Sequence, residues 1–168
     1  MTRLFPLANV IDSDDWYTPS WIFDGLGITF DLDVAHPDHP TAVPCHRFLT
    51  VADDGLSADW FGLVWCNPPY SAPTRWCEKW ARHEPGGCIL LRADLSTSGP
   101  FVAFAGASSV YVPRRRLQFV SGSGARTGAV NFSTVLLGRG AVADAALARL
   151  AAMFGGTART LAAEQGQL

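Results

Sequence analysis

The sequence has no long apolar run, no closely paired cysteines and no excess of basic charge, and each absence removes a class of protein. No apolar run reaches the ~18 residues of a membrane-spanning helix, and the N-terminus lacks the charged-then-apolar pattern of a secretory leader. The four cysteines are widely spaced without C-x-x-C, which is typical of a reducing compartment. We therefore expect a soluble, cytoplasmic protein with no membrane partner.

The charge balance excludes a strong non-specific attraction to nucleic acid. Thirteen Lys and Arg residues stand against fifteen Asp and Glu residues, which gives a net charge of −2. If DNA is the partner, a local basic patch has to make the contact. The only basic cluster is Arg114-Arg115-Arg116, which predicts either a phosphate contact or a solvated turn.

The length and composition fit one domain. The chain has 168 residues, of which 48% are apolar, and it contains no visible internal repeat. We expect an irregular lead-in over residues 1–15, one domain over residues 16–156, and a mobile tail over residues 157–168.

One stretch joins a short apolar strand, residues 62–66, directly to the polar segment Asn67-Pro68-Pro69-Tyr70. The two prolines fix φ and supply no N–H donor, so Asn67 and Tyr70 project from a stiff bend. The Asn67 side-chain oxygen and the Pro68 carbonyl can each accept a hydrogen bond from an exocyclic amino group, and the Tyr70 ring offers a face to a planar base. The alternative is a proline turn that closes a core strand.

Carboxylates occur at two further positions where a ligand could bind. Asp31 and Asp33 lie on one face of the strand expected over residues 28–34, and a carboxylate at a strand's C-terminal end can bind ribose hydroxyls. The alternative is a solvated edge strand. Asp54 lies in an Asp-Asp-Gly-Leu segment, where it either faces the amino group of a nucleotide-like cofactor or belongs to an ordinary turn.

The remaining periodicity predicts alternating helices and strands. A helix should open at Thr18 as N-cap with Pro19 in its first turn, and another should run from Ser71 or Thr74 to about His83. Further strands are expected at residues 88–91, 110–112 and 130–137, with a last helix over 143–154. Residues 35–60 read mostly as loop.

A metal site is not expected from the loop histidines. The relevant residues are His36, His39, Cys45 and His46, whose spacing matches no standard structural zinc pattern, because adjacent ligands rarely both reach one tetrahedral ion. We interpret these histidines as solvated loop residues.

Taken in order, four segments resemble the phage-type DNA adenine-N6-methyltransferase (Dam-like) family. They are D-W-Y-T-P, F-D-L-D-V-A, D-D-G-L-S-A-D-W and V-W-C-N-P-P-Y-S, and the resemblance covers about residues 14–138. It implies a class I S-adenosylmethionine (SAM)-dependent methyltransferase fold of the α/β, Rossmann-like kind. That fold is a doubly wound sheet with one antiparallel strand pair and with SAM at the strand ends.

The resemblance also implies roles for individual residues. The expected SAM contacts are Trp16, Thr18 and Pro19 at the methionine end, Asp33 and Ala35 in the first cofactor motif, and Asp54 and Leu56 on the adenine side. Asn67, Pro68, Pro69 and Tyr70 are expected to be catalytic. Expected DNA contacts are Arg114, Arg115, Arg116, Phe119 and Arg126. One departure concerns the first cofactor strand, since residues 35–40 replace the glycine-rich loop of wider methyltransferases.

The sequence thus predicts SAM-dependent methylation of N6 on an adenine that is flipped out of double-stranded DNA, with the base stacked on Tyr70 and Phe119 on its other face. N4-cytosine, RNA adenine and protein amide methylation remain alternatives, as does a non-catalytic binding module. The chain leaves no room for a separate target-recognition domain. Sequence specificity is therefore either low or supplied by loops or a homodimer, in the host cytoplasm if the protein is phage-encoded.

Overall fold

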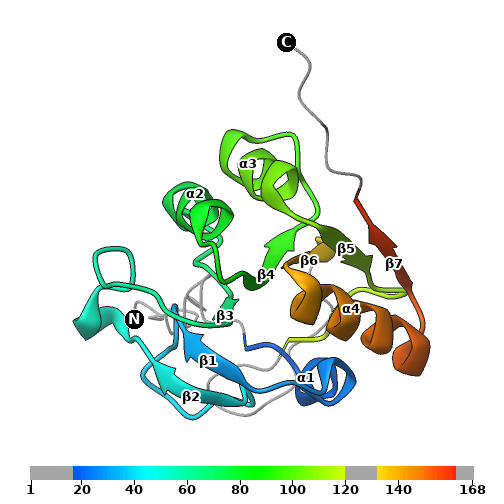
Figure 1. Cartoon of the computed structure of the whole chain (residues 1–168), viewed down its shortest axis with the longest axis horizontal. Coiled ribbons are helices and arrows are strands. Elements are labelled where there is room, and N and C mark those ends of the chain that lie inside the picture. Colours follow the sequence, from blue (N-terminus) through cyan, green and yellow to red (C-terminus); the bar gives the residue numbers. More distant parts are fainter. Residues whose placement is uncertain (1–16, 120–131, 162–168) are drawn as a thin grey trace, which may run out of the picture.

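A seven-stranded sheet lies at the centre of the molecule, with helices on both faces (Figure 1). The structure is a computed structural model and describes residues 17–119 and 132–161. The strands are β1 Phe30–Asp33, β2 Cys45–Phe48, β3 Val64–Cys66, β4 Gly87–Arg92, β5 Ser109–Val112, β6 Thr134–Arg139 and β7 Thr157–Thr160. The helices are α1 Ser20–Leu26, α2 Thr74–Arg82, α3 Ser98–Gly106 and α4 Ala141–Phe154, with a short 3₁₀ turn, η1, at Val51–Asp53.

The strand order is β2-β1-β3-β4-β6-β5-β7, and the first four strands pair in parallel. β6 is antiparallel to both β4 and β5, and β7 is antiparallel to β5. The prediction of a single antiparallel pair is therefore wrong, because two strands, β6 and β7, run against the others. Since β5 runs in the same direction as β4, the C-terminal ends of β1, β3, β4 and β5 share one edge of the sheet.

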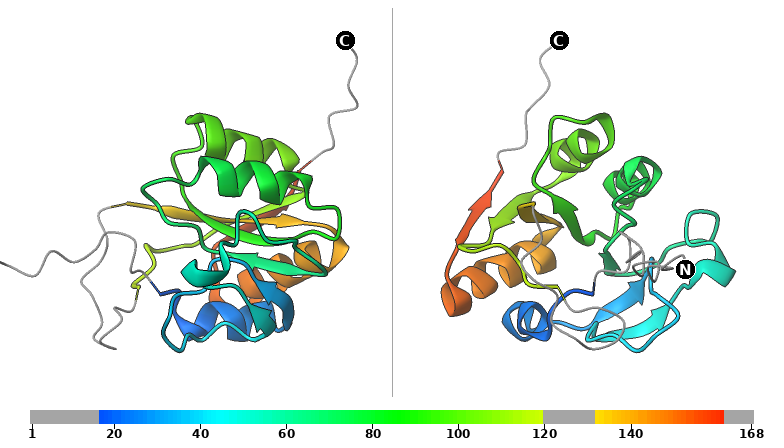
Figure 2. Two further views of the ribbon diagram at one scale, coloured as in Figure 1. Left: turned by 90° about the vertical axis from the view of Figure 1, so that its left-hand side faces the viewer. Right: turned by 180° about the vertical axis from the view of Figure 1, so that it is seen from behind.

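The core has two layers because the central strands are buried on both faces. α1 and α4 cover one face, and α2 and α3 cover the other, so the sheet lies between two helix layers (Figure 2). Along β3, Trp65 packs toward α1 and α4 while Val64 and Cys66 pack toward α2 and α3. A strand that is buried on both faces reads as a continuous apolar run, which is why residues 62–66 and 88–91 were predictable as strands.

Three elements differ from the sequence prediction. β2 and α3 lie in segments for which the sequence predicts no element, and β7 occupies the start of the expected mobile tail. The expectation of a tail from residue 157 is therefore wrong for Thr157–Thr160. Gly155 and Gly156 adopt φ values of 74° and 95°, which turn the chain back after α4 so that β7 can pair with β5.

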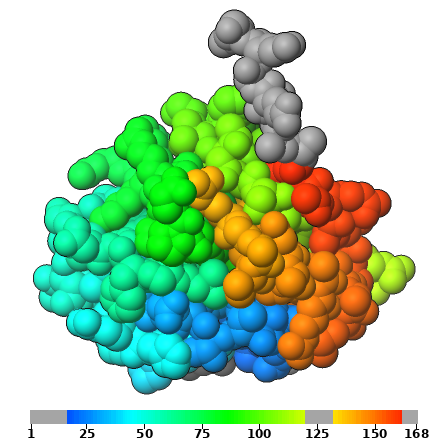
Figure 3. Space-filling model, viewed as in Figure 1, coloured from blue at the N-terminus to red at the C-terminus, as the bar shows by residue number. Residues whose placement is uncertain are grey.

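The start of α1 also differs. Thr18 was predicted to be the N-cap, but Pro19 holds that position, with extended backbone angles and no side-chain cap. Thr18 is instead buried, with 7% of its surface exposed. α1 packs beside α4, and both helices reach the surface shown in Figure 3. No helix among the described residues is both long enough and apolar enough to cross a bilayer.

The core predicts a clear contrast between two substitutions on α4. Leu147 is fully buried, whereas Val142 is 54% exposed. We expect Leu147→Ala to lower the free energy of unfolding by about 2–5 kcal/mol, because it removes buried methyl groups and leaves a cavity. Val142→Ala should change it by less than about 0.5 kcal/mol. Urea unfolding of both variants measures the difference, and equal losses would contradict the assignment of this helix face to the core.

Candidate active site

The Asn-Pro-Pro-Tyr segment lies where the ends of three parallel strands meet. β1 ends at Asp33, β3 ends directly before Asn67, and β4 ends at Arg92. Since β3 pairs in parallel with both β1 and β4, the segments that follow these strands come together at one edge. Open α/β sheets bind ligands outside the carboxyl ends of their strands.

A cavity of about 430 Å³ opens at this edge, and we call it the strand-end cavity. Its walls come from the chain before α1, the segment after β1, the loop after β2 and the chain after β3. The lining includes Tyr17, Thr18, Ala35, His36, Thr41, Leu49, Val51, Asp54, Gly55, Trp65, Asn67, Pro69 and Trp76. Segments far apart in the sequence therefore build one cavity of ligand size.

Three of the residues that the resemblance assigns to SAM line this cavity, namely Thr18, Ala35 and Asp54. Pro19 is the buried N-cap of α1 and does not line the cavity. Leu56 faces a different groove, on the far side of the loop. Trp16 lies outside the described residues.

Asp33 does not line the cavity, although the next two residues, Val34 and Ala35, do. Asp33 is buried, with 2% of its surface exposed, and its Oδ1 accepts a hydrogen bond from the Ala35 N–H at 3.3 Å. Burial raises the pKa of this carboxyl to about 7, and the hydrogen bond from Ala35 opposes that rise. The contact fixes the direction in which the chain leaves β1 toward Ala35, which lines the cavity.

Asp54 lies at the rim of the cavity in a tight turn. It has a φ of 47°, and Ser57 Oγ donates a hydrogen bond to its carboxylate at 2.6 Å. This hydrogen bond is the main reason that the pKa of the exposed carboxyl is lowered. The next residue, Gly55, has no room for a side chain, because a Cβ there would meet the Val34 carbonyl and the Trp76 ring. Asp54 therefore belongs both to an Asp-Gly turn and to a cavity wall.

The Asn-Pro-Pro-Tyr segment separates the strand-end cavity from a second one. Asn67 and Pro69 line the strand-end cavity, whereas Tyr70 lines a cavity of about 300 Å³ that we call the Tyr70 cavity. Its other lining residues are Pro73, Thr74, Leu91, Arg92, Asp94, Thr97 and Pro100. One rigid four-residue segment thus has a different hollow on each side.

Two phenylalanines pack against the Tyr70 ring. Phe119 and Phe132 meet it edge to face, with ring centroids 6.3 Å and 5.4 Å away. Its hydroxyl is buried and has no hydrogen-bond partner among the described residues, and burial raises its pKa far above the ordinary value. Phe119 is fully buried in the core. Phe119 therefore packs against the ring on which the base is expected to stack, and its own contact with a base stays a prediction.

The arginine cluster lies at the same edge of the sheet. Arg114, Arg115 and Arg116 follow the C-terminal end of β5, and all three are exposed. Arg92, at the end of β4, is also exposed, and its guanidinium lies 4.8 Å from the centroid of the Phe132 ring. Arg126 lies outside the described residues.

Several cavity residues were not predicted as site residues. Trp76 and Trp80 lie four residues apart on α2, but only Trp80 is fully buried, and Trp76 lines the strand-end cavity. His36 was interpreted as a solvated loop residue, yet it also lines the cavity and stacks on Phe48 at 4.3 Å. Within residues 17–119 and 132–161, no three His, Cys, Asp or Glu side chains are grouped so that they could hold a metal ion.

The polar segment and the ligand-sized cavity lie at the strand ends of an α/β protein, which is where open α/β sheets bind their ligands. The model of the DNA N-6-adenine-methyltransferase (Dam) family matches residues 8–139, and the chain belongs to this family. No curated protein and no solved structure matches the chain. Members of this family are DNA adenine methyltransferases, which transfer a methyl group to N6 of adenine.

The buried carboxyl of Asp33 predicts a pH-dependent stability. The unfolded chain releases this proton near pH 4, whereas the folded protein keeps it until about pH 7. Between these values the folded state binds the extra proton, so stability falls as pH rises and levels off above pH 7. The expected loss is on the order of a few kcal/mol.

Urea unfolding of the wild type and of Asp33→Asn at pH 5 and pH 8 measures this effect. Asn cannot ionise, so the variant should lack the part of the pH dependence that Asp33 contributes. Equal losses of stability in the two proteins would show that Asp33 is ionised in the fold at pH 5.

Proposed function

We propose that this chain transfers the methyl group of SAM to N6 of an adenine that is flipped out of double-stranded DNA. The observation that carries the proposal is the position of the Asn-Pro-Pro-Tyr segment between two cavities, with Asn67 facing one and Tyr70 the other. A methyl donor in the strand-end cavity and a base at Tyr70 would then meet at this segment. The helices on both faces and the reversed β6 support a class I methyltransferase arrangement.

The residues of the strand-end cavity fit SAM. Thr18 Oγ1 is buried with no hydrogen-bond partner among the described residues, so a donor or acceptor is left for a ligand. Trp76 supplies apolar ring surface, and the Asp54 carboxylate can accept a hydrogen bond from an amino group. Gly55 lets the loop pack directly against Val34 and the Trp76 ring, which fixes this wall of the cavity. SAM, when bound, supplies an electrophilic methyl group on a sulfonium.

The segment itself would activate the target nitrogen. The lone pair of adenine N6 is conjugated into the ring, so the amino group is a poor nucleophile. Asn67 Oδ1 and the Pro68 carbonyl can accept its two hydrogens and favour the tetrahedral geometry that frees the lone pair. These hydrogen bonds are strongest in the transition state, so they lower the barrier more than they improve ground-state binding. The proton can leave after the transfer, without a dedicated base.

The target base would have to leave the DNA duplex, because N6 faces its partner base within the helix. Flipping costs a few kcal/mol of stacking and pairing. The Tyr70 ring offers stacking energy in return, on the order of 1–3 kcal/mol. The Tyr70 cavity, with Arg92 and Asp94 in its wall, would receive the base or its sugar.

The decisive experiment is digestion and mass analysis of double-stranded DNA after incubation with the protein and SAM. We expect N6-methyladenine, and no N4-methylcytosine. Single-stranded RNA of the same sequence and a protein substrate are incubated in the same way, as tests of the other possible methyl acceptors. Binding of SAM without methylation of any DNA adenine would overturn the proposal.

Substitutions in the segment separate catalysis from stability. We expect Asn67→Ala to lower kcat about a hundredfold, which corresponds to about 3 kcal/mol of transition-state binding, with little change in SAM affinity. Tyr70→Ala should weaken DNA binding by about 1–3 kcal/mol through the removal of stacking. Tyr70→Phe should be nearly neutral, because the Tyr70 hydroxyl has no partner among the described residues.

The turnover rate, the SAM affinity and the melting temperature should be measured for all three variants. If the segment were only a structural turn, losses of activity would follow losses of melting temperature. A folded, SAM-binding Asn67→Ala protein that turns over like the wild type would exclude the mechanism.

The arginine cluster predicts the salt dependence of DNA binding. Replacement of Arg114, Arg115 and Arg116 by Ala should weaken DNA binding and make it less dependent on salt. The slope of the logarithm of the binding constant against the logarithm of the salt concentration should decrease in magnitude by about 0.9 for each phosphate that is no longer neutralised. A control that removes the same charge replaces three other exposed arginines, Arg82, Arg149 and Arg159. An equal change of slope in both triple variants would place the DNA surface elsewhere.

A further inference from the structure

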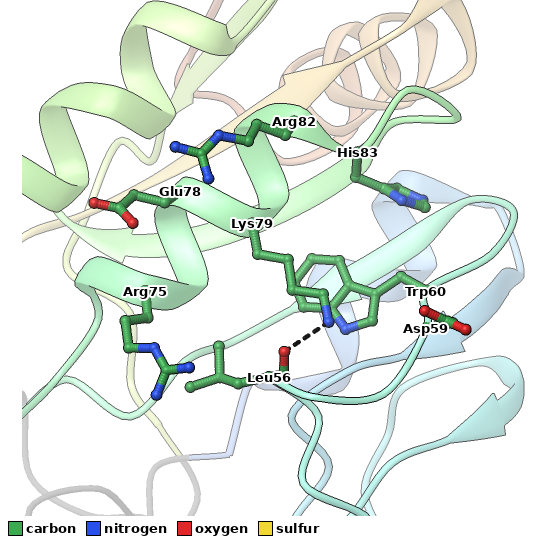
Figure 4. Close-up of a pocket in the computed structure, with 8 residues that line it drawn as sticks. All are labelled: Leu56, Asp59, Trp60, Arg75, Glu78, Lys79, Arg82 and His83. Atoms are coloured by element: carbon green, nitrogen blue, oxygen red, sulfur yellow. Dashed lines mark hydrogen bonds between the residues drawn. The ribbon is translucent and has the colours of Figure 1, made fainter.

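A lysine on α2 binds the loop that forms one wall of the strand-end cavity. The ammonium of Lys79 donates hydrogen bonds to the carbonyls of Gly55, Leu56 and Ala58, at 3.2, 2.9 and 2.5 Å. The contact lies in a polar groove of about 420 Å³ between α2 and residues 56–60 (Figure 4). We call this set of three hydrogen bonds the Lys79 contact.

The loop presents these carbonyls because it forms a single helical turn that does not continue. The N–H groups of Ser57 and Ala58 both donate to the Asp54 carbonyl, at 2.8 and 2.9 Å. The carbonyls that follow have no next turn to bind them, as at the C-terminal end of a helix. An ammonium satisfies several such carbonyls from one point, since its donors radiate from a single nitrogen. The planar guanidinium of arginine has its donors in a fixed fork, which suits paired oxygens instead.

Two tryptophans connect the Lys79 contact to the cavity. The ring of Trp60 lies 4.8 Å from the Lys79 nitrogen, and its indole N–H donates to the Gly55 carbonyl at 2.7 Å. Trp60 also stacks on Trp76, with ring centroids 6.3 Å apart. Trp76 lines the strand-end cavity together with Gly55. The loop therefore has the Lys79 contact on one side and the cavity on the other.

The close approach at Gly55 makes its position critical. A Cβ on Gly55 would meet both the Val34 carbonyl and the Trp76 ring, so the loop has almost no room to move toward β1. Movement in the opposite direction, away from β1, is limited by the hydrogen bonds that Lys79 and Trp60 donate. The Asp54–Gly55 wall is thus restrained from both sides.

We propose that Lys79 is a positioning residue that sets the affinity of the strand-end cavity for its cofactor by restraining the Asp54–Gly55 wall. It does so without lining that cavity, since the side chain faces the groove on the other side of the loop. The inference rests on the proposed function, because it takes the cofactor to be SAM. The alternative role for a lysine in a DNA-modifying protein is a contact to a DNA phosphate, and the experiments below distinguish the two.

The first experiment follows hydrogen exchange of the loop in the protein without ligand. Lys79→Met keeps the length of the side chain and removes its donors, and Lys79→Arg keeps its charge. Both should speed exchange across residues 54–60 by about tenfold, which matches the loss of one to two net hydrogen bonds. Arg82→Met is the matched control, since Arg82 lines the same groove from the same helix and is exposed. Unchanged exchange in Lys79→Met would overturn the restraint, whether or not the protein binds SAM.

The second experiment measures affinity for S-adenosylhomocysteine by calorimetry, together with steady-state kinetics on DNA. Lys79→Met and Lys79→Arg should each bind the ligand about tenfold more weakly and raise the KM for SAM by a similar factor. The kcat at saturating SAM, the DNA affinity and its salt dependence should stay within about twofold of the wild type. Arg82→Met should match the wild type throughout.

Three results of the second experiment would overturn the inference. These are wild-type ligand affinity in Lys79→Met, full recovery of affinity in Lys79→Arg, and a reduced salt dependence of DNA binding in Lys79→Met. The second result would show that charge alone matters, and the third would make Lys79 a phosphate contact. If Lys79→Met does not fold, Trp60→Phe removes the indole N–H given to Gly55 and should change exchange and affinity in the same direction. A wild-type protein that binds no S-adenosylhomocysteine, but whose loop responds as expected, would refute the proposed function and not the restraint.

Discussion

The parallel pairing of β3 with both β1 and β4 is the constraint on which the site depends. It sets Asp33 opposite Trp65 in one pair and Cys66 opposite Ile89 in the other, so β1 and β3 end within one residue of each other and β4 continues to Arg92 beside them. Gly87 permits this approach, because a Cβ there would meet the backbone of Val64. Because the strand ends lie side by side, the segments that follow β1 and β3 line the same cavity.

The sequence was most informative where local chemistry and burial agree. The prolines of the Asn-Pro-Pro-Tyr segment and the apolar run before it placed a rigid polar bend at a strand end, and the structure has it there. It was least informative at the margins of the fold. β2 and β7 are short and largely exposed, so neither has the apolar alternation that marks a strand. α3 contains Gly99 and Pro100 in its first turn and carries no charge, which hides its helical period.

Within the site, the errors come from side chains that have more than one possible environment. Trp76 lies four residues before the core residue Trp80, and the sequence does not show that Trp76 both packs against the core and lines the strand-end cavity. Nothing in the sequence predicts that Phe119 packs with Tyr70 and Phe132 and is fully buried. The Lys79 contact joins residues more than twenty positions apart, and no short pattern contains it.

The outer strands of the sheet are poor templates for the addition of a further strand. The outer strands of the described sheet, β2 and β7, have four residues each, and they carry His46, Arg47 and Arg159 as exposed side chains. An outer strand offers backbone hydrogen-bonding groups to any other extended chain, and short length with positive charge makes it a poor template. Two copies of this protein would repel one another along these borders. Within the described residues, self-association by continuation of the sheet is therefore disfavoured at both outer strands, and the two cavities lie at the strand ends instead.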